Sequence, residues 1–121
     1  MSEYIKVAVD AMGGDYAPQE PVKGVIDALN EKQELFVYLV GQEEVLKKEL
    51  EKYSYPKDRL EVVHASEIIE TGEPPVQAIQ KKKDSSLVKA LRMVRSQEAS
   101  AFVSCGSTGA VLVGGQVLVG K

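Results

Sequence analysis

The stretch that decides the fold is AFVSCGSTGA, at positions 101–110. It begins with apolar residues typical of a short buried strand and continues into a turn bounded by Gly106 and Gly109. If the small apolar residues behind the turn open a helix, the free backbone N–H groups of Ser107, Thr108 and Gly109 lie beyond the end of the strand. The helix dipole then favours an anion there. The stretch therefore predicts a phosphate or other oxyanion site built on an α/β sheet.

Outward from this stretch, strand-like segments alternate with amphipathic helical segments. Strands are expected at 5–9, 35–40, 60–64 and 101–105, and helices at 18–30, 42–53, 76–82 and from the N-cap motif at 84–86 to about residue 97. The alternation predicts one α/β domain over 1–121, with a mostly parallel sheet, helices on both faces and right-handed crossovers. Ligands of such sheets bind beyond the carboxyl ends of the strands, where the loops after Val9 and Cys105 emerge.

Composition narrows the class of protein. With 121 residues, 44% of them apolar, the chain is long enough for a real core, and its net charge of −3 argues against a nucleic-acid partner. One cysteine excludes an internal disulfide and suits a reducing compartment. The longest apolar run, 110–119, is about half of the roughly 20 residues that a membrane span needs. We expect a cytoplasmic protein, with peripheral membrane contact left open. Because the sequence stops directly after an apolar segment, we also expect a longer parent chain.

Three stretches resemble the PlsX family of bacterial phosphate acyltransferases: VAVDAMGGDYAP at 7–18, KKDSSLV at 82–88 and SCGSTGA at 104–110. The resemblance runs the whole length of the chain, and the proteins of this family are considerably longer. The third motif more usually reads SAGNTGA, so Cys105 stands for Ala and Ser107 for Asn. A role for backbone N–H groups therefore carries over to this chain, whereas a role for the Asn amide does not.

The resemblance implies transfer of a fatty acyl group from acyl carrier protein to inorganic phosphate, giving acyl phosphate for phospholipid synthesis. It implies a fold similar to the isopropylmalate dehydrogenase and phosphotransacetylase group, a homodimer, no metal and no organic cofactor. A downstream acyltransferase in the membrane would use the product. Phosphate is the nucleophile and a thiol, with a pKa of about 8.5, leaves readily. The protein's task is to hold phosphate against the carbonyl and to stabilise the oxyanion.

The basic triplet 81–83 is the strongest candidate outside the glycine loops. It precedes a helix N-terminus and Lys89 lies in the first turn, where each cation is disfavoured by about 0.3–1 kcal/mol. A bound anion between these lysines would make their interaction with the helix start favourable. Docking of an acidic carrier protein is the competing role for the triplet.

These arguments give a set of expected site residues. The expected catalytic residues are Asp10, Lys83 and Ser107. The expected substrate-binding residues are Gly13, Gly14, Asp15, Lys82, Ser85, Ser86, Gly106, Thr108 and Gly109. Plainer roles compete: Asp10 and Asp15 can cap helices, Gly13 and Gly14 can form only a turn, and we expect Cys105 and His64 to be structural.

Two other classes of function stay open. A dinucleotide-dependent dehydrogenase can use a related sheet, although the turn from Gly106 to Gly109 lacks the G-x-G-x-x-G spacing. A non-catalytic phosphate-binding module would keep the anion site alone. Residues 115–121 fit the first part of a P-loop but lack its Ser or Thr, so we reject that motif. Segment 110–119 fits a helix or a Gly-Gly hairpin, and only the resemblance favours the helix.

Overall fold

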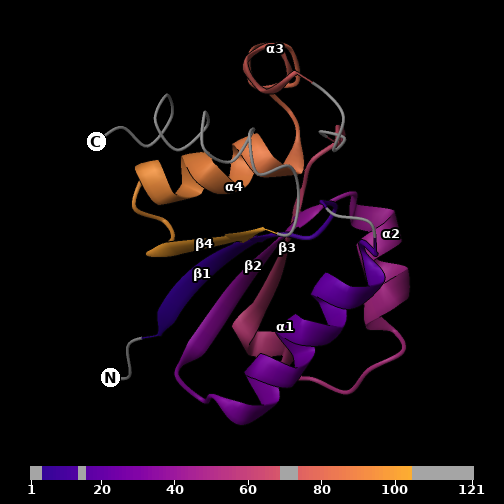
Figure 1. Cartoon of the computed structure of the whole chain (residues 1–121). Coiled ribbons are helices and arrows are strands. Elements are labelled where there is room, and N and C mark those ends of the chain that lie inside the picture. The colour runs from indigo at the N-terminus through magenta and orange to yellow at the C-terminus, as the bar shows by residue number, and fades with distance from the viewer. Residues whose placement is uncertain (1–3, 14–15, 69–73, 105–121) are drawn as a thin grey trace.

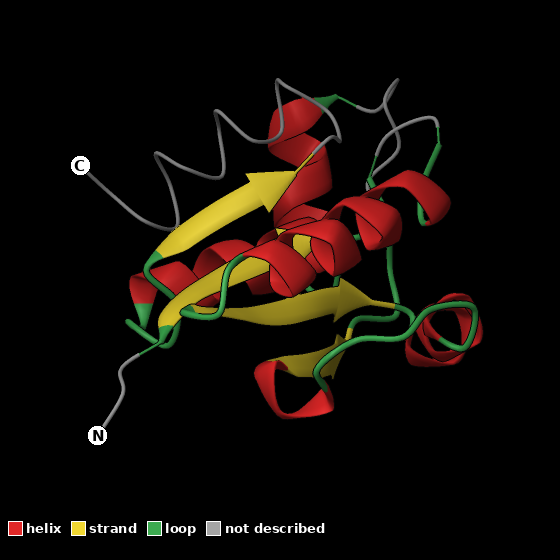
Figure 2. Cartoon of the chain, turned by 90° about the horizontal axis from the view of Figure 1, so that it is seen from below, coloured by secondary structure: helices red, strands yellow, loops and turns green. Residues whose placement is uncertain are grey.

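The computed structural model describes residues 4–13, 16–68 and 74–104, and these form one four-stranded sheet with helices around it (Figure 1). Its elements are β1 (Ile5–Asp10), α1 (Gln19–Glu31), β2 (Leu35–Gly41), α2 (Glu43–Leu50), the 3₁₀ turn η1 (Lys57–Arg59), β3 (Leu60–His64), α3 (Pro75–Lys81), α4 (Ser86–Arg95) and β4 (Ala101–Ser104). The strand order is β3-β2-β1-β4 and every pairing is parallel. Seen from below in Figure 2, the strand arrows point in one direction. All four carboxyl ends therefore lie along one edge of the sheet.

Helices cover both faces of this sheet, which confirms the predicted α/β class. In Figure 1, α3 and α4 lie above the sheet, and α1 and α2 lie on its other side, in the lower and right parts of the picture. The side of α1 and α2 is packed with aliphatic residues of the helices and of alternate strand positions: Val9, Val22, Val25, Ile26, Leu29, Val37, Leu39, Leu46 and Leu50. The opposite side is filled by Ala8, Val40, Ala90 and Met93, together with Ala78, Ile79, Leu87, Val88 and Leu91. The strand residues divide between the two sides because successive side chains point to opposite faces.

Two predicted helix ends differ from the structure. The helix predicted over 42–53 ends at Leu50, since the N–H groups of Lys52 and Tyr53 bond to carbonyls three residues back in a tighter turn. The α4 helix ends at Arg95 because Gln97 has a φ of 69°, a left-handed conformation that stops a helix.

A side chain that the sequence pattern did not single out joins α1 to the sheet. The Arg59 guanidinium donates to the Leu29 carbonyl at 2.9 Å, the Lys32 carbonyl at 2.7 Å and the Leu35 carbonyl at 3.0 Å. The first two carbonyls belong to the end of α1, where a helix leaves acceptors unpaired and favours a positive charge. Arg59 therefore secures the passage from α1 to β2.

The end of β2 requires a glycine at position 41. An added Cβ would lie 2.6 Å from Met12 Cγ and 3.1 Å from Leu46 Cδ1. We expect Gly41→Ala to lower the free energy of unfolding by about 1–3 kcal/mol because it overpacks a filled core. Urea unfolding measures the change.

Gly24, inside α1, is the matched control for this substitution. An added Cβ there meets nothing within 4 Å. We expect Gly24→Ala to raise the free energy of unfolding by roughly 0.5–1 kcal/mol, since glycine is a poor helix former. Equal changes at the two positions would contradict the steric account.

Candidate functional site

A buried carboxylate occupies the point where β1, β4 and α4 meet. Asp10 is the last residue of β1, is paired in register with Ser104 of β4, and is only 3% exposed. Its Oδ1 accepts from Ser86 Oγ at 2.5 Å and from the Met12 N–H at 3.1 Å, and its Oδ2 accepts from Ser104 Oγ at 2.9 Å. We call these four residues the Asp10 cluster. It brings together two predicted site residues, Asp10 and Ser86, from positions 76 residues apart.

The hydrogen bonds of the cluster define what each group can still do. A carboxylate oxygen accepts hydrogen bonds, and the Ser86 and Ser104 hydroxyls both donate to Asp10. These two hydroxyl protons are therefore not available to donate to a ligand. Asp10 thereby ties the ends of β1 and β4 to the start of α4. It accepts from no backbone N–H of α4 among the described contacts, so it does not act as the helix cap.

The expected N-cap of α4 is confirmed at Ser85, whose Oγ accepts from the Val88 N–H at 3.2 Å. Ser85 and Ser86 are both fully buried, and the Ser86 N–H donates to the Glu67 carbonyl at 3.1 Å. Much of the donor capacity at the start of α4 is therefore used within the protein. The loops after β1 and β4 remain the better candidates for holding an anion.

Two lysines near α4, Lys82 and Lys89, have contacts that the sequence did not predict. Lys82 is the C-cap residue of α3, where a helix dipole favours a cation, and its Nζ donates to the Ile68 carbonyl at 2.7 Å. Lys89 Nζ lies 3.0 Å from Asp84 Oδ1. Lys82 and Lys89 thus each have a partner within the protein, and the part of the triplet in an anion site stays a prediction. Lys83 is exposed, and its place in a phosphate pocket stays a prediction.

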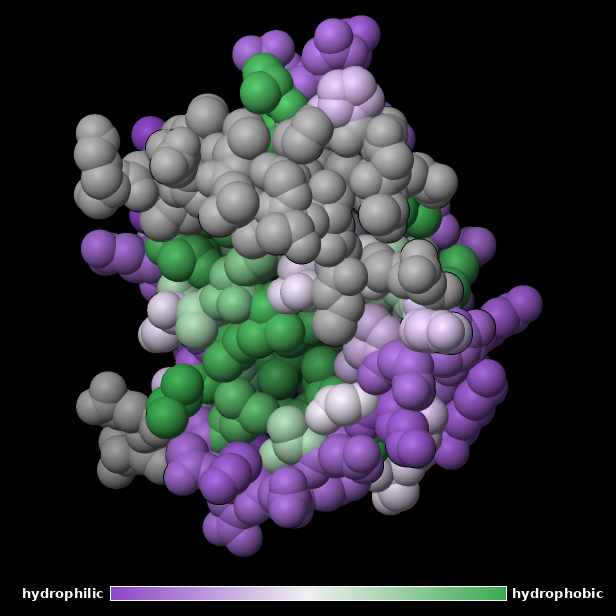
Figure 3. Space-filling model, in the orientation of Figure 1, coloured by the Kyte–Doolittle hydropathy of each residue, from purple (hydrophilic) through white to green (hydrophobic). Residues whose placement is uncertain are grey.

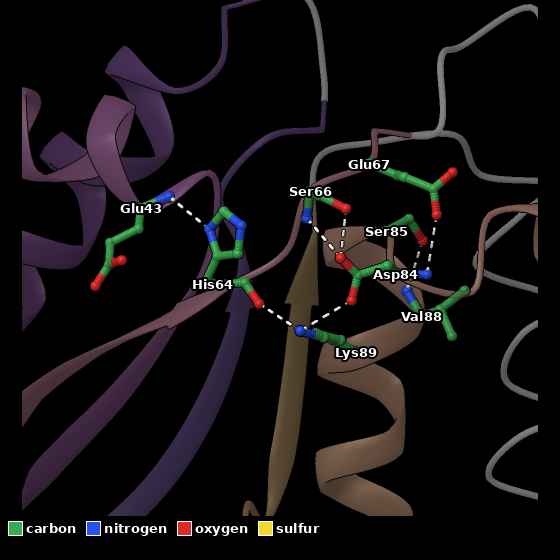
Figure 4. Close-up of polar contacts among 8 residues, drawn as sticks. All are labelled: Glu43, His64, Ser66, Glu67, Asp84, Ser85, Val88 and Lys89. Carbon is green, nitrogen blue, oxygen red and sulfur yellow. Dashed lines mark hydrogen bonds and ion pairs between the residues drawn. The ribbon is translucent and has the colours of Figure 1, made fainter.

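A second polar network joins the end of β3 to the loop before α4 (Figure 4). Asp84 Oδ2 accepts from both the Oγ and the N–H of Ser66, and the Asp84 N–H donates to Glu67 Oε1 at 3.1 Å. At the other side of Figure 4, His64 Nδ1 accepts the N–H of Glu43, the first residue of α2. That contact satisfies one of the unpaired donors at a helix start and agrees with the structural role expected for His64.

The Asp84 network makes stability depend on pH. The hydroxyl and N–H of Ser66, followed by Lys89, hold the pKa of the Asp84 carboxyl well below its usual value of 3.8. A carboxyl whose pKa is lower in the folded state stabilises the fold above its unfolded pKa, and this contribution is lost as the pH falls. We expect Asp84→Asn to be less stable than the parent at pH 7 and to lose less stability between about pH 5 and pH 2.5.

Urea unfolding across this pH range measures the difference. Asp27→Asn removes one exposed carboxylate from α1 and controls for the change in net charge. Parallel pH profiles for the parent and Asp84→Asn would contradict the assignment.

Six of the expected site residues lie outside the described residues: Gly14, Asp15, Gly106, Ser107, Thr108 and Gly109. Cys105 and the segment 110–119 lie outside them too. Gly13 is buried in the loop that follows β1. In the three described ranges, no group of three or more His, Cys, Asp or Glu side chains is placed to hold a metal ion. None of the helices in this part of the chain is both long and apolar enough to cross a membrane.

A groove runs away from the Asp10 cluster on the side of α1, between that helix and β4. Its volume is about 420 Å³, and Asp10 and Ser104 belong to its lining. The other walls are mostly aliphatic, with Val7, Val9, Val25, Leu35, Val37 and Val103 among them. Figure 3 shows the hydrophobic residues gathered in a hollow on this side of the molecule. The groove thus joins an apolar wall to a polar end.

The fold and this site define a class. The strand order changes direction between β1 and β4, because β2 and β3 follow on one side of β1 and β4 lies on the other. Open α/β sheets bind their ligands at the carboxyl edge beside such a switch point, which is where the Asp10 cluster lies. The described part of the chain is therefore an open, parallel α/β sheet with a switch point between β1 and β4.

Comparison with known proteins identifies the family. The family model described as "Fatty acid synthesis protein" matches residues 5–121, and the chain belongs to this family, which confirms the resemblance to PlsX. It is 50% identical to the phosphate acyltransferase of Clostridium tetani, over 97% of this chain and 35% of that protein. It is 51% identical to that of Syntrophomonas wolfei, over 97% and 37%. The chain thus spans about a third of the length of the curated relatives it matches.

Proposed function

We propose that the protein containing this chain transfers a fatty acyl group from acyl carrier protein to inorganic phosphate. The observation that carries the proposal is the Asp10 cluster at the switch point of the sheet, in a chain whose relatives are named phosphate acyltransferases. A phosphate oxygen bonds to the acyl carbon, the carbon–sulfur bond breaks, and the thiol leaves with a proton. The products are acyl phosphate and the free carrier thiol.

In this mechanism the chain acts by positioning and by electrostatic stabilisation. The backbone N–H groups around Gly13, Gly14, Ser107, Thr108 and Gly109 would hold the phosphate and the developing oxyanion. Asp10 is a positioning residue, because it is buried and reaches the neighbouring loops through Ser86 and Ser104.

Further roles follow from the same proposal. Lys83, exposed beside α4, would offset the charge of the bound phosphate. Asp15, Lys82 and Gly106 would complete the pocket walls, and Ser85, which is buried, would hold the start of α4 in place.

The aliphatic groove supports an acyl substrate. An acyl group needs an apolar wall for its hydrocarbon part and polar donors at its carbonyl, and the groove offers that pairing beside the Asp10 cluster. The proposal also includes a cytoplasmic homodimer that works without a metal or organic cofactor. It includes peripheral contact with the membrane, where a downstream acyltransferase uses the product.

The direct test is formation of acyl phosphate from a carrier thioester and inorganic phosphate, trapped with hydroxylamine as the hydroxamate. The full-length relative of Clostridium tetani is the positive control, and omission of phosphate is the negative control. Phosphate-dependent hydroxamate is the expected result, and Cys105→Ala should keep it, because phosphate and not the thiol is the nucleophile.

Phosphate binding without turnover would favour the binding module. Tight nicotinamide binding without turnover would favour the dehydrogenase.

A further inference from the structure

Basic residues are concentrated in one part of this acidic chain. The segment 74–100 contains six of the fifteen basic residues and only two of the eighteen acidic ones, which gives it a net charge of +4 in a chain of net charge −3. The remaining residues therefore carry a net charge of −7. This separation of charge favours an acidic partner that contacts the segment 74–100 and not the rest of the chain.

The structure places this segment on one face of the sheet. Its helices α3 and α4 pack against each other through Ile79 of α3 and Leu87 and Leu91 of α4. The apolar side of α4 is buried in this contact and against the sheet, so its charged residues lie on the outer side. Lys81, Arg92 and Arg95 are all exposed, and we call them the basic surface. No ion pair of these three residues is found among the described residues.

The helix α4 links the basic surface to the Asp10 cluster. Ser86, the first residue of α4, donates to Asp10, and Arg92 and Arg95 lie further along the same helix. A partner bound along α4 would therefore have the site at one end of its contact. A carrier that must deliver a tethered acyl group needs this arrangement.

We propose that the basic surface docks the acidic protein that carries the acyl group. The inference rests on the proposed function, since it names the surface that receives the acyl donor. Opposite charges across an interface speed association and fix the register of the two proteins. The acyl donor is the favoured occupant because the proposed reaction requires a carrier protein to reach the Asp10 cluster, whereas nothing in that reaction requires an anionic membrane at this surface.

Charge reversal tests the docking surface. The test variant is Arg92→Glu with Arg95→Glu. The matched control is Lys23→Glu with Lys48→Glu, which makes the same change in net charge at exposed positions of α1 and α2, on the opposite face of the sheet. The measurements are the binding of labelled acyl carrier protein at low and high salt, and the KM and kcat for the carrier thioester and for an acyl thioester of a small thiol.

We expect the test variant to bind the carrier roughly tenfold more weakly and the control to change less than about twofold. Binding of the parent should weaken with added salt, since exposed charges are screened. The KM should rise for the carrier thioester only, with kcat unchanged. Equal binding in the parent and both variants would overturn the proposal. Loss of binding to vesicles of anionic phospholipid, with carrier binding kept, would also overturn it.

The outcomes separate this inference from the proposed function. If the parent binds the carrier in a charge-dependent way but forms no acyl phosphate from either thioester, the docking surface stands and the transferase fails. If all variants use both thioesters equally well, the transferase stands and the docking surface fails.

Discussion

Replacing Asp10 with alanine is expected to lower the free energy of unfolding by about 3–5 kcal/mol, because three buried or half-buried donors lose their acceptor and each unpaired donor costs roughly 1–3 kcal/mol. The three donors that face Asp10 are the Ser86 hydroxyl, the Ser104 hydroxyl and the Met12 N–H. The loss of these three hydrogen bonds would also release the ends of β1 and β4 from the start of α4. We therefore expect acyl phosphate formation to disappear together with the stability. Urea unfolding and the hydroxamate assay measure the two effects.

Graded variants separate the roles of charge and shape. Asp10→Asn keeps one acceptor and the size of the side chain, so we expect it to cost about 1–3 kcal/mol, the value of hydrogen bonds to a charged group. Ser86→Ala removes one donor and leaves Asp10 with two others, for an expected loss of roughly 1 kcal/mol. We expect the loss in the free energy of unfolding to be largest for Asp10→Ala, smaller for Asp10→Asn and smallest for Ser86→Ala. An alanine variant as stable as the parent would show that the carboxylate does not hold the strand ends.

Replacing Arg59 with alanine should have the second largest effect, about 2–4 kcal/mol, because three carbonyls lose a charged donor. The guanidinium reaches the Leu29, Lys32 and Leu35 carbonyls at once, at 2.9, 2.7 and 3.0 Å. Its positive charge also meets the negative end of the α1 dipole. Arg59→Lys should recover less than half of the loss, because an ammonium on a flexible stem lacks the planar fork of donors. Thermal or urea unfolding measures the series.

Lys57→Ala is the control for this prediction. Lys57 is an exposed cation in the same 3₁₀ turn, so its removal makes the same change in charge without the carbonyl contacts. We expect it to change stability by no more than about 0.5 kcal/mol, as is usual for surface positions. Similar losses for Arg59→Ala and Lys57→Ala would mean that charge, and not the three hydrogen bonds, sets the effect.

The helices and strands could be predicted because burial leaves a periodic trace in the sequence. The buried residues of α1 are the predicted stripe of Val22, Val25, Ile26 and Leu29. The nearly continuous apolar run of β2 marked a central strand buried on both faces, and it pairs on both edges. The N-cap at Ser85 was predictable for a related reason, because a cap and its acceptor lie within one turn of the chain.

The candidate site could be predicted only in part. The motifs marked Asp10 and Ser86, but nothing in the pattern showed that the two side chains touch across 76 residues. The sequence did not show that Lys82 lies at the end of α3, because that placement depends on where the helix stops. The Arg59 contacts and the Asp84 network were missed, since a hydrogen bond between distant positions has no spacing of its own in the sequence.

The amino-acid sequence by itself determined the order of elements, the parallel α/β class and the family, since these depend on local periodicity and on short runs of identical residues. The tertiary structure alone decided which donors face Asp10, which acceptors hold Arg59, and which charges remain exposed on α4. The physical reason is that side-chain hydrogen bonds and exposure depend on which distant segments pack together. That packing becomes defined only when the strands have paired and the helices cover both faces of the sheet.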